Sequence, residues 1–123
     1  MRTIKIGLVG SGFVTHLHLN AFRQVIGIPV EIVAVASLDD VEKILDRRVD
    51  LRKMQVNVAI CNNDEQAIAV AAWARSKNLR ILEDMAIIGF NDSAIAKFQV
   101  PPIASVARED DKMVDAAVRM LFA

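Results

Sequence analysis

The sequence predicts an α/β fold: a doubly wound, five-stranded parallel sheet of flavodoxin-like or Rossmann-like form, with strand order 2-1-3-4-5. Short apolar runs alternate along the chain with segments of helical periodicity, and this alternation with right-handed crossovers produces a parallel sheet. The runs lack regular polar alternation, which is typical of strands covered on both faces. Five runs in 123 residues fit the flavodoxin-like order better than the six-stranded dinucleotide fold.

The first unit is a strand, a glycine turn and a helix. Residues 4–9 are a largely apolar run that opens into Gly10-Ser11-Gly12. In the helix that follows, apolar residues recur at spacings of three and four, which predicts one buried face. They are Phe13, Val14, Leu17, Ala21, Phe22 and Val25. Gly27 and Pro29 are expected to end this helix.

The later elements follow the same alternation. Strands are expected at residues 30–36, 56–61, 85–89 and 103–107, and helices from about 39, over 64–77 and over 110–122. Asn63 is suited to cap the helix at 64, with Gln66 reciprocating. That helix is expected to pack on Ile68, Ala71, Ala72 and Trp73. The last helix is amphipathic and is expected to pack on Met113, Val114, Ala117, Val118 and Leu121.

Length and composition indicate one soluble cytoplasmic domain over residues 1–123. Fifteen basic residues balance fifteen acidic ones, so we expect no nucleic-acid partner, which would need an unbalanced positive surface. The single cysteine, Cys61, suits a reducing compartment and no disulfide. No apolar run reaches the length of a membrane span, and the N-terminus does not resemble a signal peptide. We therefore expect no membrane partner.

Ligand binding is expected at the rim where the strands end. In a doubly wound sheet all strand-to-helix loops lie at one edge, and ligands bind there. In this sequence that edge collects the glycine turn, Ser37, residues 62–64, residues 91–93 and Arg108.

The glycine turn is a candidate cofactor site. Gly10 can adopt backbone angles closed to other residues, and Gly12 has no side chain to keep a phosphate from the amides at the helix start. The candidate cofactor-binding residues are Gly10, Ser11, Gly12, Phe13 and Ser37. The alternative is a strand-to-helix turn that merely needs glycine, because two glycines alone are a weak motif.

The sequence predicts no enzyme. No Ser-His-Asp or Cys-His arrangement and no paired carboxylates are evident, so no catalytic residue is assigned. His16 and His18 are two residues apart and face different sides of a helix, so they do not form a metal-binding pair. We expect no metal, and a surface or half-buried role for these histidines.

Residues 1 to about 37 resemble the N-terminal segment of the Gfo/Idh/MocA family of nicotinamide-dependent oxidoreductases. The resemblance rests on Gly10, Gly12 and His18, followed by Val-Ala-Val-Ala-Ser37. It implies an NAD or NADP site. Thr15 replaces the third glycine of the family motif, and Leu38 stands where an arginine commonly follows the serine. The family's catalytic Glu-Lys-Pro motif is missing.

Residues 40–123 resemble the C-terminal lobe of the effector-binding domain of LacI-type repressors, a periplasmic-binding-protein-like fold. The resemblance rests on Ala-Ile-Cys-Asn-Asn63-Asp64, on Met-Ala-Ile-Ile-Gly89-Phe-Asn91-Asp, and on Pro101-Pro-Ile-Ala-Ser-Val. It implies that Asn63 and residue 91, usually Asp in that family, reach toward an effector held between two lobes. Here position 91 is an uncharged Asn.

Together the two resemblances favour an engineered or recombined chimera, a scaffold without evolved catalytic activity, with a crossover near residues 37–40. A natural one-domain signalling or enzyme module of flavodoxin-like shape is a further hypothesis, and two binding alternatives also remain. One is weak NAD-like nucleotide binding at the Gly10–Gly12 turn, although no cofactor is expected. The other is residual sugar or small-molecule binding at a rim formed by Asn63 and Asn91. Apolar helix faces that a missing lobe would cover are expected to be exposed, which would allow a homodimer.

Overall fold

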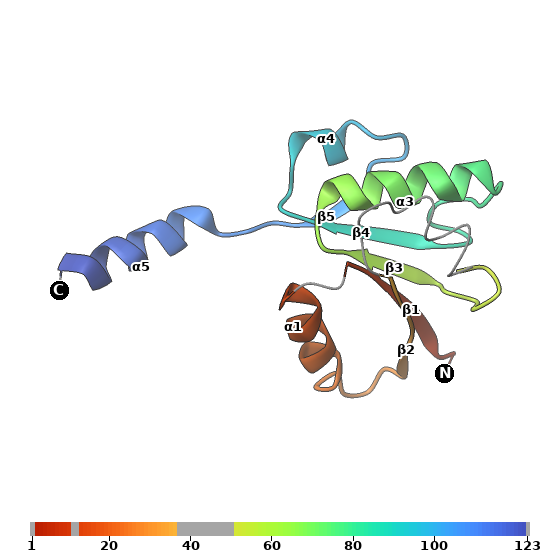
Figure 1. Ribbon diagram of the computed structural model, residues 1–123, viewed down its shortest axis with the longest axis horizontal. Helices are drawn as coiled ribbons and strands as arrows, with labels where there is room; N and C mark the ends of the chain where they lie inside the picture. The colour runs from red at the N-terminus through yellow and green to blue at the C-terminus, as the bar shows by residue number, and fades with distance from the viewer. Residues whose placement is uncertain (1, 11–12, 37–50, 123) are drawn as a thin grey trace.

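The computed structural model describes residues 2–10, 13–36 and 51–122. Figure 1 shows a twisted sheet with α3 lying along one face and α5 projecting far from it. Five strands form one sheet in the order β2-β1-β3-β4-β5, and every paired neighbour is parallel. The predicted fold class and strand order are confirmed. The helix expected from about residue 39 and the crossover at 37–40 lie outside the described residues, and the single domain over 1–123 stays a prediction.

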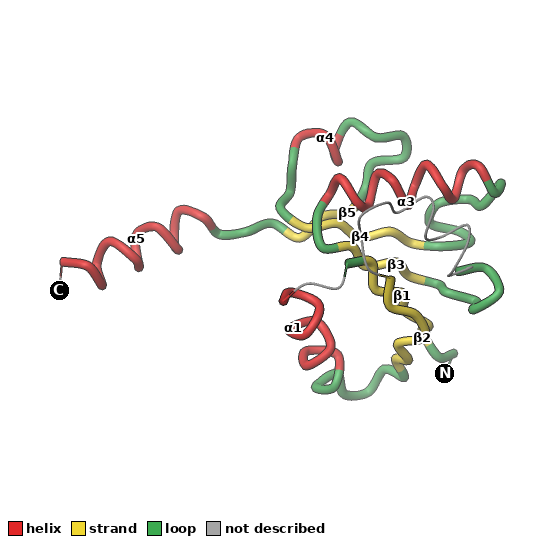
Figure 2. The backbone as a smooth tube through the Cα atoms, viewed as in Figure 1, coloured by secondary structure: helices red, strands yellow, loops and turns green. Residues whose placement is uncertain are grey.

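The element bounds agree with the sequence expectations to within about two residues, except that α1 ends at Phe22, before the expected stop at Gly27. The strands are β1 (Ile4–Val9), β2 (Val30–Ala36), β3 (Val58–Cys61), β4 (Ala86–Phe90) and β5 (Ala104–Val106). The described helices are α1 (Phe13–Phe22), α3 (Asp64–Ser76), the short α4 (Ala94–Lys97) and α5 (Asp110–Phe122). The strands form the yellow layer of Figure 2. β3 begins at residue 58 instead of 56, because Val56 N–H donates to Leu51 O in a turn instead of to a strand.

The core lies between the sheet and α3. Trp73 is 2% exposed, and Val70, Ala71 and Ala74 on the same helix are also buried. They pack with residues of the inner strands, such as Ala59 and Ile87. Burial of such apolar side chains is the main stabilising contribution to folding. Two of the expected contacts of α3 differ: Ile68 is only partly buried, and Ala72 is exposed because it lies on the opposite face of the helix.

The expected packing of α5 is wrong. The helix forms over the expected residues, but none of them is buried, and Figure 1 shows it extending away from the sheet on a thin connection. Its apolar residues stand in solvent: Met113, Val114, Val118, Met120, Leu121 and Phe122 are 47–86% exposed. The periodicity correctly predicted an amphipathic helix, whereas periodicity does not say which surface covers the apolar face.

The expected burial of one face of α1 is also only partly observed. Phe22 is partly buried, but Leu17 is 52% exposed and Val25, just beyond the helix, is 42% exposed. The side chains of residues 13–16 lie outside the described part of the chain. None of the helices within residues 13–36 and 51–122 has the length and apolar content needed to cross a membrane.

Candidate functional site

The carboxyl edge of the sheet brings two of the predicted sites together. Gly10 follows β1, and Asn62 and Asn63 follow the neighbouring strand β3. Asn62 N–H donates to Val9 O at 3.0 Å, which fixes the two loops side by side. Asn91 follows β4, the next strand of the sheet. The parallel order therefore gathers the glycine turn and both predicted ligand-contacting asparagines along one rim.

Gly10 is required by its own turn. Its φ is +114°, and a β-carbon there would overlap the side-chain amide of Asn62. Only glycine adopts such angles without strain, so the turn and its asparagine neighbour account for this residue without a ligand. Ser11, Gly12 and Ser37 lie outside the described residues. Phe13 is the first residue of α1. The proposed cofactor set therefore stays a prediction.

Asn63 caps α3, as the sequence predicted. Its side-chain oxygen accepts a hydrogen bond from Gln66 N–H at 2.9 Å, which satisfies one of the free amides of the first helical turn. The Gln66 side chain reciprocates one residue earlier than expected, accepting from Asn62 N–H at 3.1 Å. Asn63 is partly exposed, and its Nδ2 group donates to no other described residue. A hydrogen-bond donor is therefore left at the rim.

Asn91 sits in an unusual backbone conformation. Its φ is +102°, and that of Asp92 is +53°; non-glycine residues rarely adopt positive φ, and such residues concentrate at functional sites. Backbone bonds hold the pair in place: Asn91 N–H donates to Val106 O at 2.9 Å, and Asp92 N–H donates to Ser105 Oγ at 2.9 Å. The Asn91 side chain is exposed and bonds to no other described residue.

Asp64 connects the loops of this rim from inside. Its carboxylate is fully buried. One oxygen accepts from Ser105 Oγ at 2.5 Å, and the other accepts from Ser93 N–H at 2.7 Å. Burial alone would raise the pKa of this carboxyl, but the hydrogen bonds from Ser105 and Ser93 outweigh burial and lower it. The ionised Asp64 carboxylate therefore links the loop after β3 to Ser93, which follows β4, and to Ser105 in β5.

The sequence did not single out Asp64 for this role. The helix-start pattern Asn-Asp explains an acidic residue in the first turn of a helix, where the positive end of the dipole favours it. Its connection to Ser105, 41 residues away, has no local signal in the sequence. A serine within the predicted strand at residues 103–107 is the one hint that the sequence offers.

His18 brings an imidazole from α1 to this edge. Its ring lies edge-on to Phe90, the last residue of β4, with centroids 6.2 Å apart and an interplanar angle of 70°. The ring is half-buried, as expected, and its buried Nε2 atom has no hydrogen-bond partner in the described part of the chain. Within those same residues, no group of three or more His, Cys, Asp or Glu side chains is arranged to hold a metal.

The chain matches one protein family over most of its length. A model of the periplasmic binding protein-like domain family matches residues 20–123. This match crosses residues 37–40, where the sequence suggested a junction, and it begins inside the segment that resembled an oxidoreductase. The match therefore gives no support to a Gfo/Idh/MocA segment.

Natural regulators match part of the chain. The HTH-type transcriptional regulator MalR of Streptomyces coelicolor is 34% identical over 63 residues. The HTH-type transcriptional regulator GalR of Lacticaseibacillus casei is 33% identical over 64 residues. The HTH-type transcriptional repressor PurR of Haemophilus influenzae is 33% identical over 62 residues. The aligned segments cover 50–52% of this chain and only 18–19% of those proteins.

Solved structures show the same fold over nearly the whole chain. A LacI-family regulator from Arthrobacter gives a TM-score of 0.70 at 17% identity, covering 98% of this chain and 46% of that one. A putative LacI-family regulator from Sanguibacter keddieii gives 0.73 at 20% identity, covering 94% and 47%. The complex of the regulator CelR with cellobiose gives 0.73 at 21% identity, covering 95% and 38%. This chain thus spans about half of those structures or less.

These findings correct one interpretation and agree with another. The reading of the chain as an engineered or recombined chimera is wrong, because one family model crosses the supposed junction and natural regulators match the chain. The matched proteins are named as transcriptional regulators, in agreement with the prediction that this chain is not an enzyme.

Proposed function

This chain belongs to the periplasmic binding protein-like domain family, and we propose that it forms one lobe of the effector-binding domain of a LacI-type transcriptional regulator. In this proposal the rim containing Asn63 and Asn91 contacts a neutral sugar or sugar-like effector. The chain spans about half of the similar regulator structures, so the other half would supply the second wall of the effector cleft.

The observation that carries this proposal is the arrangement of the two asparagines. They follow neighbouring parallel strands, β3 and β4, at the same edge of the sheet. The buried Asp64 carboxylate fixes both loops, since it begins the helix after Asn63 and accepts the N–H of Ser93 two residues beyond Asn91. Ligands of doubly wound folds bind at this edge.

The chemistry of the rim suits hydroxyl groups. The Asn63 side chain retains a donor after capping α3, and the Asn91 amide offers both a donor and an acceptor. Sugar hydroxyls donate and accept in the same way. Because the charge of Asp92 is already paired with Lys97 at 3.1 Å, the rim recognises a neutral ligand better than a charged one.

The exposed α5 also supports a missing second half. An amphipathic helix with an uncovered apolar face needs a surface to bury it. We propose that the apolar face of α5 packs against the part of the regulator that this chain does not span. The expectation of no nucleic-acid partner stays a prediction for this chain, since its relatives are HTH-type regulators and that motif binds DNA.

A titration followed by NMR tests the rim. Lactose and cellobiose are added to the ¹⁵N-labelled chain while the side-chain amide signals of Asn63 and Asn91 are observed. Asn63→Asp keeps the helix cap but removes the donor, and Asn91→Gly removes the side chain while relieving the positive φ. We expect saturable shifts that both variants weaken.

Asn78→Gly is the matched control, since Asn78 also has a positive φ, of 57°, and follows the C-terminal end of α3. It should leave sugar binding unchanged. The rim would be refuted as the effector site if the asparagine amide that remains in each variant shifts as much as it does in the unaltered chain. It would also be refuted if neither sugar gives a saturable shift.

A further inference from the structure

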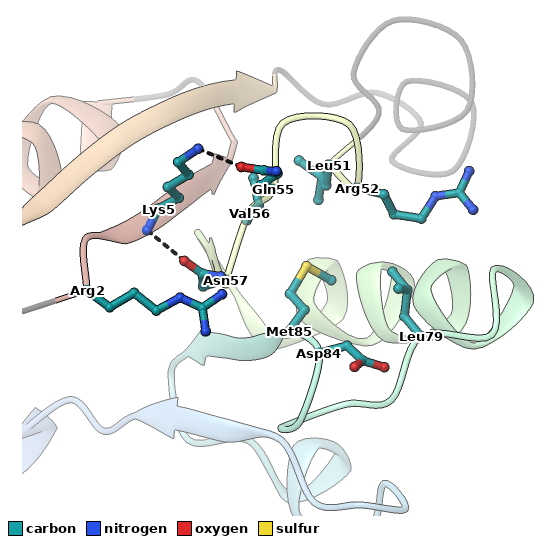
Figure 3. A pocket seen from close by; sticks show the side chains of 10 residues that line it. All are labelled: Arg2, Lys5, Leu51, Arg52, Gln55, Val56, Asn57, Leu79, Asp84 and Met85. Carbon is teal, nitrogen blue, oxygen red and sulfur yellow. Dashed lines mark hydrogen bonds between the residues drawn. The ribbon is translucent and has the colours of Figure 1, made fainter.

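A pocket of about 320 Å³ opens at the opposite edge of the sheet from the asparagine rim. It lies where β1, β3 and β4 begin, between the turn that contains Gln55 and the loop that contains Met85 (Figure 3). The volume is at the lower end of the range for small-molecule sites. Nothing in the proposed effector site uses this pocket.

The polar wall of the pocket presents mainly hydrogen-bond donors, because the side-chain oxygens of Asn57 and Gln55 each already accept a hydrogen bond. Lys5 N–H donates to Asn57 Oδ1 at 3.0 Å, and Lys5 Nζ donates to Gln55 Oε1 at 3.0 Å. Figure 3 shows both bonds on one side of the pocket. The NH₂ groups of Asn57 and Gln55 make no hydrogen bond with another described residue. Two neutral side chains that ordinarily offer both functions therefore offer mainly N–H.

The wall is also positively charged. Arg2, Lys5 and Arg52 line the pocket. Arg2 is exposed and forms no ion pair with another described residue, and the partner of the Lys5 ammonium in this wall is the uncharged Gln55. Neither charge is neutralised there, so both add to the attraction for an anion.

Among the described residues, Asp84 is the one carboxylate that lines the pocket, and its oxygens are already hydrogen-bonded. Asp84 accepts from the Arg80 side chain at 2.6 and 2.9 Å and from the Arg80 backbone at 2.8 Å. Both of its oxygens are thus engaged in a two-pronged pair with a guanidinium. Asp84 consequently leaves the surplus of positive charge in the pocket largely intact.

Beneath this wall the pocket is apolar. Leu51, Val56 and Met85 are 1–6% exposed and belong to the core. Leu79 also lines the pocket and is only partly buried, so a ligand with a small apolar body would cover it and gain the corresponding burial, whereas an inorganic ion would not.

We propose that this pocket binds a compact organic anion, a carboxylate or phosphate ester whose charged group meets Arg2, Lys5 and the Asn57 and Gln55 amides, and whose apolar body covers the floor. The site is independent of the effector rim, because it lies at the other end of the same strands. Failure of one proposal leaves the other standing.

The test uses the ¹⁵N-labelled 123-residue chain with phenyl phosphate, benzoate and the neutral benzyl alcohol as probes. We expect saturable shifts of the Gln55 and Asn57 side-chain amides with an anionic probe, with little change at Asn63. Comparison of the two anions shows whether phosphate or carboxylate is preferred. Arg2→Met and Lys5→Met keep much of each aliphatic stem and should each weaken binding by about tenfold, as loss of one charge-assisted hydrogen bond does.

Lys112→Met, which removes an exposed lysine paired with Glu109 on α5, is the matched control and should bind like the unaltered chain. The proposal is overturned if neither anion gives a saturable shift. It is also overturned if benzyl alcohol binds as well as the anions, or if Arg2→Met and Lys5→Met retain full affinity. Arg2 is exposed, so its variant folds and the comparison can be made.

Discussion

The carboxylate of Asp64 occupies the space that a β-carbon at position 89 would need, so Gly89 is a glycine because of its neighbour at the start of α3. Gly89 does not have a positive φ and is not needed for a turn. This contact explains how a charged group is buried beside β4. The absence of a side chain at Gly89 leaves room for the carboxylate, and Ser105 and Ser93 donate hydrogen bonds to it. Buried charges persist only with such compensation.

We predict that Gly89→Ala destabilises the chain by about 2 kcal/mol, the cost of overpacking a filled interior. In an Asp64→Ala background the same change should cost at least about 1 kcal/mol less, because residues in direct contact couple by amounts of this order. Some cost should remain, since the Asp64 Cα lies 3.2 Å from the added carbon. Urea denaturation of the four proteins measures the cycle, and additive effects would contradict the contact.

Stability should depend on pH through Asp64. Its pKa is lowered in the folded chain from the ordinary value of 3.8, so its ionised form contributes stability above pH 4 that is lost as pH falls through the folded pKa. Asp64→Asn should cost about 2 kcal/mol at pH 7, as expected for hydrogen bonds to a charged group. The difference between the two proteins should shrink when unfolding is measured near pH 3.

Asp111→Asn serves as the control for this pH dependence, because Asp111 is exposed on α5. It should change unfolding little at either pH. A difference between Asp64→Asn and the unaltered chain that stays constant from pH 7 to pH 3 would show that the carboxylate charge is not what stabilises the loops.

The apolar face of α5 should contribute little to the stability of this chain. Val118→Gln together with Leu121→Gln is expected to change the free energy of unfolding by less than about 0.5 kcal/mol, which is typical of surface positions. The same variant should reduce self-association in sedimentation experiments, because it removes exposed apolar area. A loss of stability as large as that caused by Val70→Gln in the buried face of α3 would mean that α5 packs on the sheet.

Cys61 should be inert while the chain is folded. Burial, with a smaller contribution from the charge of Asp64, raises the pKa of its thiol from 9.0 to about 12. Since the thiolate is the reactive form, the rise in pKa alone slows reaction at pH 8 by about a thousandfold. Labelling with a disulfide reagent should therefore follow unfolding in urea. Rapid labelling of the native chain would contradict the buried position.

The fold was predictable because local patterns determine most of it. Continuous apolar runs, turn residues and helical spacing sufficed for the strands and their order, and Asn63 was predicted as a cap from its distance to Gln66. The predictions failed where a surface had to be paired with another surface. The spacing of Val114 and Val118 predicts an apolar helix face, but it does not indicate whether the sheet covers that face, and in the structure both residues are exposed.

The sequence predicted where in the fold the candidate site lies, but not the contacts that hold its loops together. Asn63 and Asn91 were assigned by resemblance, and their location at one edge followed from parallel topology. The long-range tie through Asp64 could not be foreseen, because it joins segments 29 and 41 residues apart. The sequence also did not predict the pocket at the other edge. Its NH₂ donors face the pocket because the side-chain oxygens of Asn57 and Gln55 already accept hydrogen bonds from Lys5, and only the three-dimensional structure shows these bonds.

The projecting α5 has a final consequence for association. Its first turn carries Asp110 and Asp111, its last turn carries Arg119, and Arg119 pairs with Asp115 at 2.8 Å. These charges favour the helical form along the polar side, by small amounts each. A segment already helical loses less conformational entropy when it docks than a disordered one. The helix is thus pre-organised, and joining it to the second half that we propose would require burial of a face and little new folding.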